Sequence, residues 1–182
     1  MVESVVARWV VTAAIGSVGL AHLCGLTTGR AVVHRVDGCA HAVTCGALIA
    51  VVWPWGSWLP VWPQVALVAC AGAWFTARGL VAVGGGEPDL RVAAVPASHA
   101  VGGFALVWAL VAVGVGAHGR DDPGWPVSFP ASVLGLGSLL VAGWWLREAC
   151  TRGVADRVAS RVAVVGHAVL NGGVAVLLFA LR

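Results

Sequence analysis

The chain has 182 residues, of which 59% are hydrophobic and 10% are charged, and its formal net charge is +3. A soluble domain carries about 25% charged residues because its surface meets water, so this composition excludes a soluble catalytic domain and indicates an integral membrane protein in a lipid bilayer. The net charge is too small and too dispersed to indicate a nucleic-acid partner.

Long stretches without a charged side chain lie at 10–29, 38–77, 92–119, 123–146 and 162–181. A helix needs about 20 apolar residues to cross the hydrocarbon core, so four of these stretches fit one crossing each. The longest fits two, because the prolines in its middle, Trp53-Pro-Trp-Gly-Ser-Trp-Leu-Pro-Val-Trp-Pro63, cannot continue a helix. The tryptophans of this turn suit the headgroup level of a membrane.

The expected fold is therefore all-α: a polytopic membrane helix bundle that forms a single integral membrane domain over residues 1–182. Its six transmembrane helices are expected at about 6–26, 38–53, 62–81, 92–116, 127–147 and 162–181.

The arginines predict the orientation of the bundle. With six spans both termini lie on one side of the membrane, and the loops divide the arginines unequally between the two sides. Arg8, Arg120 and Arg182 share the side of the termini, whereas Arg30, Arg35, Arg78, Arg91, Arg147, Arg152, Arg157 and Arg161 lie on the other. The positive-inside rule then places the termini outside. All basic residues are arginine, which is typical of a high-GC bacterial genome, so the expected location is a bacterial inner (plasma) membrane.

An internal repeat is indicated by three helices that begin alike. The second, fourth and sixth expected helices start with His41-Ala-Val, His99-Ala-Val and His167-Ala-Val. Two of the preceding helices end in Trp74-Phe-Thr-Ala-Arg78 and Trp144-Trp-Leu-Arg147. This pattern predicts three parallel helix-hairpin repeats. The alternative is chance recurrence in a chain rich in alanine and valine.

Four histidines are expected at one depth in the membrane. His22, His41, His99 and His167 each lie four to eight residues from the nearest charged residue toward the expected cytoplasmic side. At about 1.5 Å per residue, they form a layer roughly 6–12 Å inside the boundary. Ionisable side chains within spans usually face the bundle interior and have partners there.

Imidazole is the commonest side-chain ligand for transition metals, so this layer predicts a metal site for copper or zinc. The predicted ligands are His41, His99 and His167, with Cys45 as a fourth, because it lies on the same helix face four residues after His41. His22 is a reserve ligand, since its counterparts in the later repeats are aromatic. Asn171, four residues after His167, is expected to orient that ring by hydrogen bonding.

Two other functions stay open. Two histidines on facing helices can ligate haem iron, although the chain lacks a second histidine layer for a two-haem electron wire. Alternatively, the histidines only tie helices together in a non-enzymatic structural or accessory subunit. Enzymatic chemistry has the least support, because no carboxylate lies inside an expected span.

The chain also resembles a known family. Its residues from Arg35 through His41 to Trp53-Pro-Trp55-Gly56, then Pro63-Gln64 and Trp74-Phe75, are similar to an uncharacterised actinobacterial family of small polytopic membrane proteins, catalogued as a domain of unknown function. The resemblance covers nearly the whole chain.

In that family a histidine on each of three helices is followed by methionines at helical spacing, which implies a copper(I) site. This chain departs from the pattern, because its single methionine is Met1. The corresponding positions hold Thr44, Cys45, Gly102, Gly103, Leu170 and Asn171. Among these residues only Cys45 offers sulfur.

Overall fold

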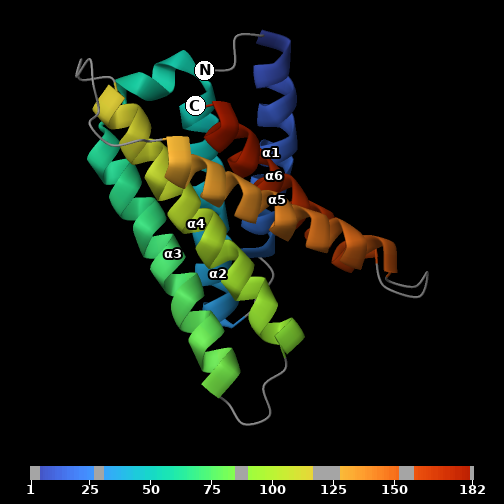
Figure 1. Ribbon diagram of the computed structural model, residues 1–182. Helices are drawn as coiled ribbons and strands as arrows, with labels where there is room; N and C mark the ends of the chain where they lie inside the picture. Colours follow the sequence, from blue (N-terminus) through green and yellow to red (C-terminus); the bar gives the residue numbers. More distant parts are fainter. Residues whose placement is uncertain (1–4, 27–30, 85–89, 117–127, 152–157, 181–182) are drawn as a thin grey trace.

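The computed structural model describes residues 5–26, 31–84, 90–116, 128–151 and 158–180, and within these ranges it contains six α-helices and no strand (Figure 1). The helices are α1 (Val5–Leu26), α2 (Val32–Val52), α3 (Val61–Gly84), α4 (Leu90–Gly116), α5 (Ser128–Thr151) and α6 (Val158–Ala180), with a short 3-10 helix, η1 (Pro54–Trp58), after α2. The all-α expectation is confirmed.

Several helices extend beyond the apolar stretches that predicted them. α2 begins at Val32 rather than near 38, so that Arg35 and Asp37 lie inside its first turns. α3 continues past Arg78 to Gly84. Arginine is a good helix former and a single aspartate is tolerated in a helix, so a charged residue marks where an apolar span ends and not where the helix ends.

Five of the helices are long and apolar enough to cross a membrane. The spanning stretches are Val5–Cys24, Val32–Val52, Val61–Gly84, Ala94–Ala112 and Pro130–Thr151. α6 offers a shorter described apolar stretch, Val164–Phe179. Many large apolar side chains point outward, among them Val6, Val81 and Leu140, each about 70% exposed. These surfaces indicate a membrane protein whose helices contact lipid.

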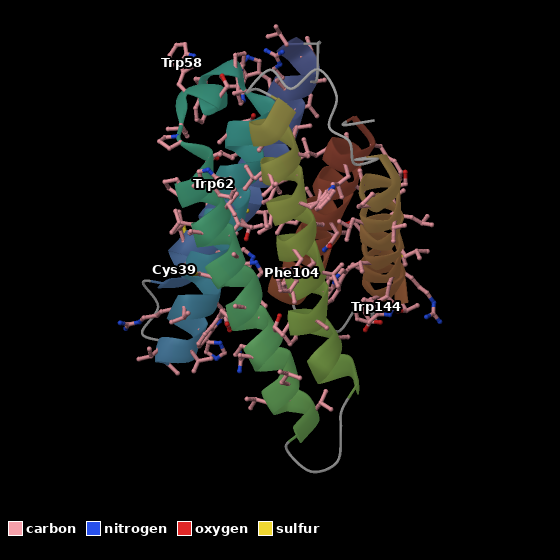
Figure 2. The ribbon with its side chains drawn as sticks, turned by 60° about the vertical axis from the view of Figure 1, so that its left-hand side comes forward. Cys39, Trp58, Trp62, Phe104 and Trp144 are labelled. Carbon is pink, nitrogen blue, oxygen red and sulfur yellow. The ribbon has the colours of Figure 1, made fainter. Side chains whose placement is uncertain are left out.

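The proline- and tryptophan-rich turn between α2 and α3 ends one helix and starts the next. Trp53 is extended, and Pro54 begins η1. Trp53 donates its indole N–H to the Thr12 hydroxyl on α1 at 2.7 Å, which ties the turn to the first helix. Gly56 is required here, because a Cβ atom would overlap the Ala50 carbonyl oxygen. In Figure 2 the turn that carries Trp58 lies at the upper end of the molecule, above Cys39 and Trp144.

Helices that are neighbours in sequence pack in pairs, and the even-numbered helices meet in the middle. The closest pairs are α1 with α2, α3 with α4, and α5 with α6. α2 also contacts α3, α4 contacts α5, and α6 returns to contact α1, while α2, α4 and α6 contact one another. In Figure 1 α5 slants across the bundle. This arrangement brings residues on the three even-numbered helices to a common centre.

Candidate metal centre

Three histidines from three different helices meet in that centre. His41 lies on α2, His99 on α4 and His167 on α6, and all three residues are 6–8% exposed. Each ring has a nitrogen that can serve as a ligand atom, and these three nitrogens, one from each ring, all lie within 4.8 Å of one another. Nitrogens bound to one tetrahedral ion at about 2.1 Å lie ~3.4 Å apart, so small rotations of the rings bring all three to a shared ion. These buried histidines can therefore hold a metal ion.

The rings of the three histidines contact each other directly. The centroid of the His99 ring lies 4.2 Å from that of His41 and 4.4 Å from that of His167, with the ring planes inclined by 82° and 64°. His41 and His167 are farther apart, at 5.8 Å. His99 therefore stands between the other two and is the member that links them.

Two ring nitrogens of this trio lack a hydrogen-bond partner among the described residues. They are His99 Nε2 and His167 Nδ1, and both are buried. A buried polar atom without a partner costs about 1–3 kcal/mol, and such atoms are rare in native structures. A neutral imidazole carries a proton on one ring nitrogen and a lone pair on the other, and a nitrogen in its lone-pair form can bind a hydrogen-bond donor or a transition-metal ion.

Aromatic rings from the odd-numbered helices surround the trio. Phe75 on α3 packs against both His41 and His99, at centroid distances of 4.8 and 4.9 Å. Trp145 on α5 packs against His167 at 4.7 Å. His22 on α1 stacks on His41 at 4.0 Å and lies 6.3 Å from His167. We call His22, Phe75 and Trp145 the outer ring of the site.

Trp145 has a second role that the sequence pattern did not indicate. Its indole N–H donates to the Ser98 hydroxyl at 3.2 Å, next to His99 in the chain. The Ser98 hydroxyl in turn donates to the Val95 carbonyl oxygen at 2.7 Å. The recurring aromatic pair at the ends of the third and fifth helices was the available signal, because it places Phe75 and Trp145 at corresponding positions.

A second polar contact lies one helical turn from His41. Asp37 accepts a hydrogen bond from the Trp74 indole N–H at 2.7 Å, and an Arg78 nitrogen lies 3.5 Å from its other oxygen. The exposed His34 ring is 3.9 Å from the same oxygen. The spacing of Trp74 and Arg78, four residues apart on α3, could have predicted that both face α2. This contact joins α2 and α3 beside the site.

The other two predicted ligands lie beside the trio. His22 is half-buried and stacks on His41, and it is not one of the three residues that can share an ion. Cys45 is 3% exposed and likewise stands outside that group. Its sulfur lies against α1, since a Cβ atom built on Gly19 would be 3.5 Å from it. Four residues advance a helix by about 6 Å, so Cys45 meets α1 at a level beyond the histidines.

Asn171 does not bond the His167 ring as the sequence suggested. Its side-chain N–H donates to the backbone carbonyl oxygen of His167 at 2.9 Å. In a helix the carbonyl four residues back is the nearest acceptor, and a short amide side chain reaches it more easily than the ring. The amide oxygen, Oδ1, has no hydrogen-bond partner among the described residues.

Comparison with known proteins identifies the family of the chain. Neither the curated proteins nor the solved structures gave a match to the chain. Residues 33–181, which hold the three histidines, match the family described as Domain of unknown function (DUF5134). The chain therefore belongs to that family.

Proposed function

We propose that this protein binds one transition-metal ion, copper or zinc, inside the membrane through His41, His99 and His167. The observation that carries the proposal is the pair of buried ring nitrogens, His99 Nε2 and His167 Nδ1, that have no protein partner within the described residues although they lie in a group of three histidines. An ion bound by the trio through these two nitrogens would satisfy both atoms at once.

The donor set limits the class of metal. Three imidazoles and no carboxylate form the group, whereas calcium and magnesium prefer oxygen ligands. Imidazole suits zinc, copper, iron and nickel. Cys45 lies against α1 and His22 stacks on a ligand, so a site built on the three histidines alone does not depend on sulfur. We propose zinc and copper as the first ions to test.

The same geometry argues against haem and against a purely structural role. The cavity beside the trio has a volume of about 20 Å³, whereas pockets for drug-sized ligands span about 300–1,000 Å³. A porphyrin does not fit this space without separating the helices. Histidines that only tied helices together would use their nitrogens as hydrogen-bond donors or acceptors, and two of those nitrogens have no partner in the part of the chain that the structure describes.

The proposal places the site in a bundle of six spans built from three parallel helix-hairpin repeats. Two features support this arrangement. Each even-numbered helix contributes one histidine of the trio, and each odd-numbered helix contributes one side chain of the outer ring. The contacts between α2 and α3, α4 and α5, and α6 and α1 follow the same order around the centre. From the arginine distribution we propose a bacterial plasma membrane with the termini outside.

Metal content tests the proposal directly. The wild-type chain, a variant with His41, His99 and His167 all replaced by alanine, and His34→Ala are purified in detergent and analysed for metals. His34 is an exposed histidine of α2 outside the trio and serves as the matched control. We expect close to one ion per chain in the wild type and in His34→Ala, and almost none in the triple variant. Unchanged metal content in a folded triple variant would overturn the proposal.

A further inference from the structure

A small cavity lies about one helical turn beyond the histidines, between α2, α4 and α6. Its wall includes His41 and His99, and then Thr44, Gly102 and Asn171, which follow the three histidines by three or four residues. The volume is about 20 Å³. A single water molecule needs roughly 10–15 Å³ of such space, so the cavity has room for one water.

Asn171 turns an unpaired oxygen toward this cavity. The residue is 3% exposed, and its amide orientation is fixed because the His167 carbonyl oxygen, its partner at 2.9 Å, can only accept a hydrogen bond. Oδ1 must therefore be the free atom, and it has no donor among the described residues. A Cβ atom built on Gly102 would be 3.3 Å from Oδ1, which places this oxygen at the cavity wall where α4 has no side chain.

The hydroxyl groups of the wall have already donated their hydrogens. Thr44 donates to the Ala40 carbonyl oxygen at 2.9 Å, and Ser98 donates to that of Val95 at 2.7 Å. Asn171 Oδ1 thus needs a donor that neither hydroxyl can supply. The group that fits is a small oxygen ligand with hydrogens of its own, which is water.

We propose that the metal ion carries a water molecule as its fourth ligand, held in this cavity by a hydrogen bond from the water to Asn171 Oδ1. The inference rests on the proposed metal site. A water bound to the ion next to His41 and His99 would occupy the cavity with its oxygen toward the metal and one hydrogen toward Asn171. Three protein ligands and one water form an open site, in contrast to closed structural sites that have four protein ligands. The ion therefore keeps one position at which a small oxygen ligand can exchange.

The test uses Cu²⁺ as the probe, in detergent-purified full-length protein exchanged into D2O. Pulsed electron paramagnetic resonance then reports two signals separately: nitrogen couplings from the imidazoles, and a deuterium coupling from a metal-bound water. Gly102→Ala fills the cavity from the α4 side and keeps the Asn171 amide, whereas Asn171→Leu removes the acceptor. Gly46→Ala, a position on α2 where a Cβ atom meets nothing within 4 Å, is the matched control.

We expect imidazole couplings in all four proteins, and a deuterium coupling in the wild type and Gly46→Ala that falls at least twofold in Gly102→Ala and Asn171→Leu. Imidazole couplings without a deuterium coupling in the wild type would overturn the water ligand alone. A deuterium coupling that both cavity variants leave unchanged would overturn the placement of the water in this cavity and its hydrogen bond to Asn171. Loss of the imidazole couplings themselves would remove the metal site, and the water with it.

Discussion

The even-numbered and odd-numbered helices differ in what they carry and in what they face. In their apolar stretches α2 and α4 are 39% and 50% buried, whereas α1, α3 and α5 are 11–22% buried. The inner helices α2, α4 and α6 bring the three histidine rings to the centre, and the outer helices bring rings that pack around those histidines. In lipid, where apolar surface is not expelled, close packing of this outer layer is what can hold the histidines in place.

The largest effect is expected at Trp145 of the outer layer. This side chain is 2% exposed, packs on His167 and bonds Ser98. Truncation of a buried tryptophan costs about 3–5 kcal/mol, so Trp145→Ala should lower the free energy of unfolding in detergent by that amount. Thermal unfolding measures it. Trp145→Phe keeps most of the packing and loses the hydrogen bond, which is worth about 1 kcal/mol. Equal losses in the two variants would show that packing is not the main contribution.

The second-largest effect is expected at His99 on the inner helix α4. Its ring contacts both other members of the trio. Loss of an outer-shell partner alone reduces metal affinity by about 10–100-fold, so loss of a ligand in His99→Ala should reduce it by at least about 100-fold. Competition with a chelator of known affinity gives the value. His34→Ala should leave it unchanged. If His99→Ala retains wild-type affinity, the inner helices do not provide the ligands.

A close approach between the outer helix α3 and the inner helix α4 predicts that two glycine variants differ in stability. A Cβ atom on Gly103 of α4 would lie 3.1 Å from the Gly72 Cα atom on α3, whereas a Cβ atom on Gly72 would lie no nearer than 3.9 Å to α4. Because backbone must shift in the first case, Gly103→Ala should lower the free energy of unfolding by about 1–3 kcal/mol. Gly72→Ala should change it little. Thermal unfolding of the two variants side by side checks this, and the reverse order would contradict the packing.

Much of this architecture could be predicted from the sequence, because lipid imposes simple requirements. Apolar length alone predicted the helices, and the prolines predicted the turn at Pro54. That His41, His99 and His167 lie at one level was predicted from their shared place in the His-Ala-Val motif near the start of three expected helices. This prediction requires only that the three helices cross the membrane at the same depth.

The details that the sequence missed depend on how each helix is rotated about its axis. Cys45 shares a helix face with His41, yet it lies against Gly19 of α1. The Asn171 side chain donates to the backbone carbonyl oxygen of His167 in its own helix and not to the His167 ring. Spacing along one helix places two side chains on the same face, as it does for Trp74 and Arg78, but it does not reveal which residue of the neighbouring helix lies at that level, here Asp37.

The smallest effect is expected at His22, and it decides to which layer this residue belongs. His22 stacks on His41 at 4.0 Å with an interplanar angle of 21°, at a place corresponding to Phe75 and Trp145 in the outer ring. His22→Phe keeps a stacked ring without nitrogens, so metal affinity should stay within about threefold, since a ring pair is worth about 0.5–1.5 kcal/mol. His22→Ala, which removes the ring, should weaken affinity by the full amount, about 2–10-fold. Equal and large losses in both variants, measured by the same chelator competition, would make His22 a ligand and α1 a fourth inner helix.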